Sequence, residues 1–238
     1  MEKNKVAEMF NNIASGYDFL NRTLSLGIDK IWRRKLRKKL DAFDPAVILD
    51  IATGTADLAI ECAKSKKHTS RKITGIDISE KMLEKGREKI EKKHLDDRIV
   101  LQYGDSENME FDSNTFDAVV VGFGVRNFEN LEKGLKEIYR VTKHSGKVFI
   151  LDFSMPRNPF IRIFYEFYFF RILPFIGKTI SGDNYAYKYL PESVCRFPQY
   201  EQMTGLMNNA GFVNTEYQSL TFGIAVIYSG AKMVDYLQ

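Results

Sequence analysis

Short apolar runs that alternate with helical patterns constrain the fold of this chain more than any other feature. Five runs, each almost continuously apolar, occupy residues 46–51, 72–77, 98–103, 116–121 and 147–151. Such runs are typical of strands that are covered on both faces. Apolar residues at helical spacing separate several of them, at about 55–66, 79–93 and 131–141. The alternation predicts a doubly wound α/β fold with a mostly parallel sheet.

The last part of the chain extends this sheet. A predicted helix at 199–210 precedes two β runs, 212–219 and 222–231, which we expect to pair antiparallel because few residues separate them. The result is a Rossmann-like sheet of seven strands with an antiparallel last strand. We predict a single domain, made of an N-terminal helical lid (1–42), a cofactor-binding core (43–152), an aromatic substrate insertion (153–198) and a C-terminal helix and strand pair (199–234).

Length and composition limit the class of protein. The 238 residues suit one large domain, and a net charge of +4 only weakly favours anionic partners, so no nucleic acid is expected. The two cysteines, Cys62 and Cys195, show no metal-ligand spacing, which indicates a reducing compartment and no metal. The longest apolar run carries charges and the N-terminus lacks a signal-like segment, so we expect a cytoplasmic protein that could rest on a membrane surface.

The loop after the first strand, Thr53 to Leu58, contains a single glycine, Gly54. A dinucleotide-binding loop needs three glycines, and here Ala56 and Ala59 occupy the second and third positions. Those glycines allow the backbone to approach a pyrophosphate. The loop therefore favours a nucleoside ligand that has no pyrophosphate.

Acidic residues at the ends of the predicted strands indicate which nucleoside. Asp77 closes the second strand, 23 residues after Gly54, where a carboxylate can accept both hydroxyls of a ribose. It could instead cap the helix that starts at Ser79. Asp50 next to the loop would attract an ammonium or sulfonium group and repel a pyrophosphate.

The third strand is followed by Asp105 and Ser106, which could bond the amino group and ring edge of adenine. Each of these features alone has a structural explanation. Their conjunction at successive strand ends, where ligands of open α/β sheets bind, predicts S-adenosylmethionine as the cofactor.

Two longer motifs carry a family resemblance. The segment YDFLNRTLSLGIDKIW (17–32) resembles the pattern Y-D-x-x-N-x-x-L-S-x-x-x-H-x-x-W, and RVTKHSGKVFILDFS (140–154) resembles R-V-x-K-P-G-G-x-x-x-x-x-E-x-S. Both are similar to the quinone C-methyltransferases of menaquinone and ubiquinone biosynthesis, a class I S-adenosylmethionine-dependent family, over about residues 5–233. The chain departs from the patterns at Asp29 for His, His144-Ser145 for Pro-Gly and Asp152 for Glu.

The resemblance implies both a cofactor site and a reaction. Family contacts to S-adenosylmethionine fall at positions that match Thr55, Asp77, Asp105 and Ser106. The implied reaction transfers a methyl group to a ring carbon of a prenylated quinol. Ala56 resembles the menaquinone-type members, which favours demethylmenaquinol, and the benzoquinol precursor of ubiquinone remains the alternative.

Three residues are candidates for the chemistry on the quinol. Arg126, in GFGVRNF after the fourth strand, can stabilise a developing phenolate because its guanidinium stays charged. Asn127 either orients the quinol or caps the following helix. Tyr17, with Asp18 beside it, either covers the cofactor or belongs to a turn that packs on the sheet.

Two segments raise the question of a membrane. Eight aromatic residues within 160–175 are expected to hold the prenyl tail, with simple burial against the sheet as the alternative. Residues 29–41 carry seven basic residues beside a stripe formed by Ile28, Trp32, Leu36 and Leu40. We favour a helix whose apolar stripe docks on the protein while its basic face stays in solvent. The alternative is a helix that anchors the chain on anionic lipid. The oligomeric state stays open, with a dimer as one option.

Other functions fit less well. A nicotinamide dehydrogenase would need the missing glycines and a proton donor such as a Tyr-x-x-x-Lys pair. An amino-type nucleic-acid methyltransferase usually carries [DN]-P-P-[YF] after the fourth strand, where this chain reads GFGVRN. A lipid-amine or sterol methyltransferase is disfavoured only by the two motifs, and a non-catalytic S-adenosylmethionine-binding module is the remaining alternative.

Overall fold

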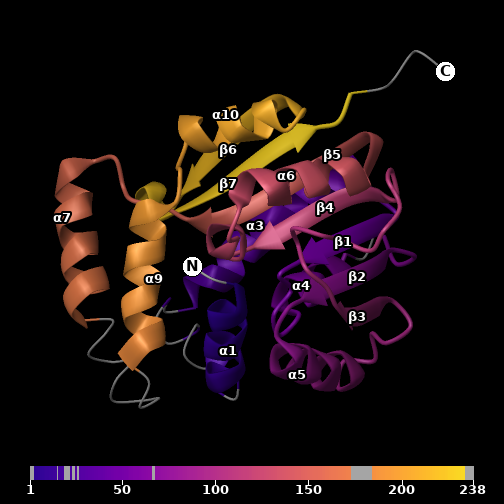
Figure 1. Cartoon of the computed structure of the whole chain (residues 1–238), viewed down its shortest axis with the longest axis horizontal. Coiled ribbons are helices and arrows are strands. Elements are labelled where there is room, and N and C mark those ends of the chain that lie inside the picture. Colours follow the sequence, from indigo (N-terminus) through magenta and orange to yellow (C-terminus); the bar gives the residue numbers. More distant parts are fainter. Residues whose placement is uncertain are drawn as a thin grey trace.

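A computed structural model describes residues 3–14, 16–18, 22, 25, 27–65, 68–172 and 184–233, with only the backbone described at 184–188. Its centre is a seven-stranded sheet in the order β3-β2-β1-β4-β5-β7-β6 (Figure 1). Neighbouring strands from β3 to β5 pair in parallel, whereas β7 is antiparallel to both β5 and β6. The strands are β1 (Val47–Ile51), β2 (Lys72–Asp77), β3 (Ile99–Tyr103), β4 (Phe116–Gly122), β5 (Thr142–Phe153), β6 (Val213–Leu220) and β7 (Ala225–Ala231).

Helices cover both faces of the sheet, as the continuous apolar strands require. One face is covered by α3 (Ile28–Phe43), α4 (Asp57–Ala63) and α5 (Glu80–Glu91), which contribute Leu36, Ile60 and Leu83 to one core cluster. The other face is covered by α6 (Leu131–Val141) and α10 (Glu201–Asn209), which bury Leu135 and Met203. Alternate residues of β1 point into the two clusters.

The predicted seven-stranded, mostly parallel sheet is confirmed, and so is its antiparallel last strand. Two details differ. β7 lies inside the sheet between β5 and β6, so the strand before the last forms the edge. β5 begins at Thr142 instead of 147, because Thr142 pairs with Phe116 before a register shift in the ladder. Strand pairing beyond that irregularity decides the longer strand, and an apolar run cannot indicate it.

The basic helix α3 docks by its apolar stripe. Trp32 is 3% exposed, and Leu36 and Leu40 are fully buried. The indole Nε1 of Trp32 donates to Oγ1 of Thr221, at 2.8 Å, in the turn η3 (Thr221–Gly223) between β6 and β7. This arrangement confirms the docked stripe and leaves the Trp32 ring inside the protein, so it cannot anchor the chain on lipid.

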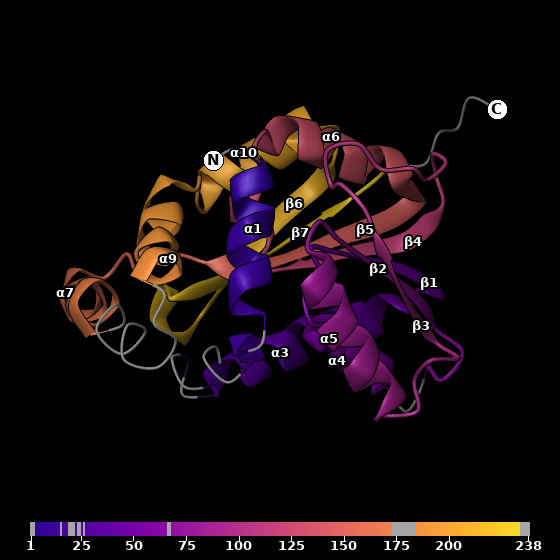
Figure 2. The same cartoon turned by 60° about the horizontal axis from the view of Figure 1, so that its bottom comes forward.

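Helix α1 (Lys3–Ile13) lies between α5 and α9 (Asn184–Arg196), across the carboxyl ends of the strands (Figure 2). The hydroxyl of Ser79 donates to Oδ1 of Asn11 at 2.7 Å, which ties α1 to the start of α5. On its other side, Met9 packs against Tyr189 of α9. The N-terminal segment therefore contributes a wall to whatever binds at this edge of the sheet.

The aromatic insertion divides into a buried and an exposed part. It contains α7 (Pro159–Phe167), η2 (Tyr168–Ile172) and α9. Tyr165 and Phe169 pack against Val194, whereas Phe160 and Phe164 are 75% and 77% exposed. Phe175 lies outside the described residues. Within the described part of the chain, no helix has the length and apolarity to cross a bilayer.

Candidate cofactor and substrate site

A cavity lies at the carboxyl ends of β3, β2, β1 and β4, where open α/β sheets bind their ligands. Its space measures about 670 Å³ when the opening to solvent is included. Helix α1 supplies a further wall. The lining residues are Lys3, Val6, Phe10, Tyr17, Ala52, Gly54, Asp77, Ile78, Met82, Gly104, Asp105, Ser106, Glu107, Gly122, Phe123, Gly124, Asn127, Phe128 and Glu129.

The backbone conformation of the first loop favours glycine at position 54. Gly54 has a φ of 54°, in the left-handed region, and a Cβ built there would meet no atom within 4 Å. Ala52 and Ala56 adopt the same region at φ 51° and 64°. Ala56 is fully buried at the N-cap of α4 and does not line the cavity. One glycine therefore suffices where the backbone faces the ligand.

Asp77 lines the cavity and also accepts from two backbone N–H groups, so its contact with a ribose stays a prediction. Its Oδ2 accepts from the backbone N–H of Gly54 at 2.8 Å, and its Oδ1 accepts from the N–H of Ser79 at 2.9 Å. The carboxylate thus supports the first loop and the start of α5 while it lines the cavity. Burial raises the pKa of Asp77 to about 6, against the opposing effect of these backbone N–H groups.

Asp105 and Ser106 also line the cavity, as predicted for an adenine site. Nζ of Lys3, at the start of α1, lies 2.6 Å from Oδ2 of Asp105 and 3.6 Å from Oε2 of Glu107. Glu107 is buried and accepts from the N–H of Glu129 at 2.7 Å. The sequence pattern missed Lys3, because only the fold brings α1 to the end of β3, and it missed Glu107 although this residue directly follows Ser106.

The charge of the cavity wall limits the ligand. Among the described lining residues, four carboxylates face a single lysine, Lys3. The carboxylates belong to Asp77, Asp105, Glu107 and Glu129. Such a wall attracts a cation and repels a pyrophosphate. These hydrogen-bond acceptors fit S-adenosylmethionine, whose sulfonium and ammonium are positive and whose ribose and adenine offer hydrogen-bond donors.

Three predicted site residues lie outside the lining, namely the cofactor contacts Asp50 and Thr55 and the substrate candidate Arg126. Asp50 is fully buried on the α4 side of the sheet, where its Oδ2 accepts from the hydroxyl of Thr53 at 2.7 Å. Burial raises the pKa of Asp50 to about 7. Thr55 is 3% exposed, and its hydroxyl donates to Oδ1 of Asp18 at 2.6 Å. Neither Asp50 nor Thr55 lines the cavity and both make contacts that support the first loop, so their contact with the cofactor stays a prediction.

Arg126 forms a buried ion pair next to the cavity. It lies in η1 (Val125–Asn127), and its Nη1 donates to Oδ1 of Asp152, at 2.7 Å, and to the carbonyl of Phe123. The side chains of Arg126 and Asp152 are 6% and 0% exposed. Nε of Arg126 is buried and has no hydrogen-bond partner among the described residues. One donor of the guanidinium is thus uncommitted.

Asn127 and Tyr17 lie in the cavity wall. Oδ1 of Asn127 accepts from the hydroxyl of Tyr189 at 3.1 Å, and the N-cap of α6 is Asn130. Asn127 is therefore not the helix cap that was its alternative role. Tyr17 packs edge-on against Phe10 of α1, with ring centroids 6.0 Å apart.

Metal ligands do not gather in this site. Over the described residues, no group of three or more His, Cys, Asp or Glu side chains is arranged to hold an ion.

The fold and this acidic cavity together define a class I S-adenosylmethionine-dependent methyltransferase. A solved structure titled a putative S-adenosyl-L-methionine-dependent methyltransferase from Methanococcus maripaludis has the same fold, with a TM-score of 0.64. It is 20% identical, and the match covers 96% of this chain and 95% of that chain.

The chain belongs to the ubiE/COQ5 methyltransferase family, whose model matches residues 1–232. It is 46% identical over 228 residues to a ubiquinone/menaquinone biosynthesis C-methyltransferase of Geotalea daltonii, which covers 96% of each chain. It is 43% identical to a demethylmenaquinone methyltransferase of Bacteroides fragilis, over 96% of this chain and 92% of that one. The family resemblance of the two motifs is thereby confirmed, and with it the assignment as an S-adenosylmethionine-dependent C-methyltransferase.

Proposed function

We propose that this enzyme methylates a ring carbon of a prenylated quinol, with demethylmenaquinol as the first candidate. The observation that carries the proposal is the position of Arg126. It follows β4 directly beside the cavity-lining residues Gly124 and Asn127, and its buried Nε is uncommitted. The names of the two relatives support the same substrate class.

When bound, S-adenosylmethionine supplies an electrophilic methyl group. In this proposal Asp77 holds the ribose, Asp105 and Ser106 hold the adenine, and the first loop at Gly54 lies against the methionine part. This order follows the strand order β3-β2-β1-β4, so residues at the end of β4 would meet the methyl group that the bound cofactor supplies. The apolar side chains of Phe10, Phe123 and Phe128 in the wall would exclude water there.

Arg126 would act on the oxygen of the quinol. The ring carbon becomes nucleophilic as the neighbouring hydroxyl loses its proton, and the guanidinium stabilises the negative charge that develops. Because Arg126 stays protonated, it is not the base, and the proton passes to water or to a carboxylate. Asp152 fixes the orientation of the guanidinium by the 2.7 Å contact.

Tyr165 offers a second donor for the same substrate. Its hydroxyl is buried and has no hydrogen-bond partner among the described residues. Its ring stacks on Phe169, which neighbours Phe153, and the guanidinium of Arg126 lies 5.4 Å from the centroid of the Phe153 ring. Buried polar groups are rarely left unpaired, so two such groups against one aromatic cluster favour a bound hydroxylated ring.

The choice between the two quinols rests on the names of the relatives and not on a contact between a residue and the quinol ring. Ala56, which resembles the menaquinone-type members, is buried away from the cavity and cannot touch the ring. One relative is named for demethylmenaquinone alone and the other for both pathways. Demethylmenaquinol therefore stays the first candidate, with the benzoquinol precursor of ubiquinone, or both quinols, as the alternative.

The deciding experiment incubates the purified enzyme with S-adenosylmethionine labelled in its methyl group and with each reduced quinone in turn. We expect label in the naphthoquinol, on a ring carbon. Label in the benzoquinol alone would replace the first candidate by the alternative. Binding of S-adenosylmethionine without transfer to either quinol would overturn the proposed function.

A prenylated substrate requires access to lipid, and α7 presents a suitable surface. Phe160, Ile163, Phe164 and Phe167 follow helical spacing and are each more than 60% exposed. Apolar patches of this kind on a soluble domain mark an interaction site. We propose that this face rests on the cytoplasmic surface of the membrane, so that the enzyme is a cytoplasmic, peripheral membrane protein.

A further inference from the structure

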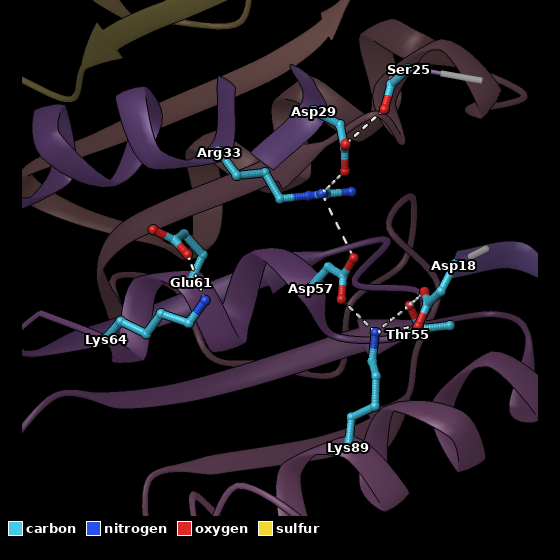
Figure 3. Close-up of polar contacts among 9 residues, drawn as sticks. All are labelled: Asp18, Ser25, Asp29, Arg33, Thr55, Asp57, Glu61, Lys64 and Lys89. Carbon is cyan, nitrogen blue, oxygen red and sulfur yellow. Dashed lines mark hydrogen bonds and ion pairs between the residues drawn. The ribbon is translucent and has the colours of Figure 1, made fainter. Parts of the chain in front are cut away.

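A chain of polar contacts runs beside the cavity and joins α3, the first loop, α5 and the N-terminal segment (Figure 3). Oδ1 of Asp29 accepts from the hydroxyl of Ser25 at 2.7 Å, and its Oδ2 pairs with Arg33. Nη1 of Arg33 also lies 3.7 Å from Oδ2 of Asp57, at the start of α4. Asp29, which replaces a histidine of the family pattern, therefore belongs to this chain of contacts.

Lys89 is the junction of these contacts. Its Nζ lies 2.5 Å from Oδ1 of Asp57, 2.8 Å from Oδ2 of Asp18 and 2.9 Å from Oγ1 of Thr55. An ammonium group has three N–H donors, so these three acceptors use all of them. They come from two separate parts of the chain, the N-terminal segment with Asp18 and the first loop with the start of α4, and Lys89 holds both against α5 (Figure 3).

Asp18 connects this junction to the cavity. It is the neighbour of Tyr17, which lines the cavity, and its other carboxylate oxygen accepts from the hydroxyl of Thr55 at 2.6 Å. Thr55 directly follows Gly54 in the first loop. The backbone that carries Tyr17 is thus fixed relative to the loop on which the cofactor rests.

The environment makes these contacts stronger than ordinary surface ion pairs. The side chains of Lys89 and Asp18 are 19% and 26% exposed, and that of Arg33 is 9% exposed. Burial by itself would raise the pKa of Asp57, but the charges of Lys89 and Arg33 outweigh it and lower that pKa. Partly buried networks of this kind fix geometry, whereas exposed pairs contribute little.

We propose that Lys89 is a positioning residue, which places Tyr17 and the first loop for cofactor binding through Asp18, Thr55 and Asp57. Lys89 does not line the cavity and touches neither cofactor nor substrate in this scheme. The inference rests on the proposed use of the cavity for S-adenosylmethionine. It makes no assumption about the quinol.

The sign of the effect separates positioning from simple electrostatics. Removal of the ammonium makes the surroundings of an already acidic cavity more negative. By charge alone, this change should favour the cationic S-adenosylmethionine over the uncharged thioether of S-adenosylhomocysteine. Loss of positioning should instead weaken both ligands to the same extent.

The test measures the binding of both ligands by calorimetry in Lys89→Met, Lys89→Arg and Lys85→Met. Lys85 is the matched control, because it lies on α5 and forms an ion pair with Glu88 alone among the described residues. We expect about tenfold weaker binding of both ligands in Lys89→Met, and changes below about threefold in Lys89→Arg and Lys85→Met. Unfolding curves of all variants would identify a variant that fails to fold.

A second variant tests the route through Tyr17. In a Tyr17→Ala background, Lys89→Met should weaken binding by clearly less than it does in the wild type, because one of the two parts that it positions is gone and only the first loop remains. Unchanged or tighter cofactor binding in a folded Lys89→Met would overturn the proposal, and so would full additivity with Tyr17→Ala. An enzyme that binds S-adenosylmethionine but methylates no quinol would overturn the proposed function and leave this inference standing.

Discussion

Arg126 and Asp152 form an ion pair, 2.7 Å between Nη1 and Oδ1, in which both side chains are almost completely buried. Removal of one partner from such a pair leaves an uncompensated charge in the interior, which costs several kcal/mol. Removal of both is tolerated far better. The pair therefore allows the role of Arg126 in turnover to be separated from its role in stability.

We expect Arg126→Ala to lower turnover of the quinol by about tenfold or more while S-adenosylmethionine binding survives. The double variant Arg126→Met, Asp152→Asn should regain stability but not turnover, because it removes the unpaired charge and still lacks the donor. Steady-state rates and thermal unfolding would be measured in parallel. Wild-type turnover in either variant would remove Arg126 from the chemistry.

Asp77 should make cofactor binding dependent on pH. Its pKa is raised to about 6 by burial, and contact with a cation and two ribose hydroxyls favours its ionised form. Affinity for S-adenosylmethionine should therefore fall by about tenfold between roughly pH 7 and pH 5, as the carboxylate takes up a proton.

Asp77→Asn provides the comparison for this prediction. The variant should bind S-adenosylmethionine weakly at every pH and show a flat profile between these values. Asp97→Asn, in the turn before β3, should behave like the wild type. If the wild-type profile were equally flat in calorimetry, Asp77 would not bind the cofactor as an anion.

Asp50 should make the ligand-free protein less stable as the pH rises. Burial raises its folded pKa to about 7, above the value of 3.8 for a free carboxyl group. Between these values the folded state holds a proton that the unfolded state has lost, so the free energy of unfolding falls as pH rises and the loss is complete above about pH 7.

Asp50→Asn removes this titration. From about pH 5 to about pH 8, its free energy of unfolding should rise relative to the wild type by roughly 3 kcal/mol. Urea unfolding at the two pH values measures the difference, and all other titrating groups are common to both proteins. A difference that does not change with pH would mean that Asp50 is ionised throughout.

The exposed face of α7 should mediate binding to lipid. We expect the wild type to float with vesicles of phosphatidylethanolamine and phosphatidylglycerol, and Phe160→Ser, Phe164→Ser to lose about fivefold or more of this binding. Val100→Ser, which changes an exposed residue of β3, is the control. If the double variant bound vesicles normally but converted a dimer to a monomer in sedimentation, this face would be a subunit interface instead.

The sequence predicted the sheet well because strands and helices depend on local patterns. The apolar runs at 46–51 and 72–77 became β1 and β2 with almost the same boundaries. Parallel strands bring their carboxyl ends to one edge, so Asp77, Asp105 and Ser106 could be placed together from sequence alone. All three line the cavity.

The sequence pattern did not predict which face of the sheet each side chain points to. Asp50 shares the α4 face of β1 with Ile48, whereas Leu49 and Ile51 point to the opposite face. An alternating period shows which residues share a face but not which face meets the ligand. Asp50 does not line the cavity, and its contact with the cofactor stays a prediction.

The sequence by itself determined the carboxyl ends of β1, β2 and β3, the family resemblance and the acidic residues at or just after these ends. All of these depend on residues close together in the chain. Only the tertiary structure decided which groups meet across long separations, as Lys3 does with Asp105, Arg126 with Asp152, and Lys89 with Asp18. Such pairs depend on how whole elements pack. No local pattern of charges specifies which partner a lysine or arginine will find once the helices are in place.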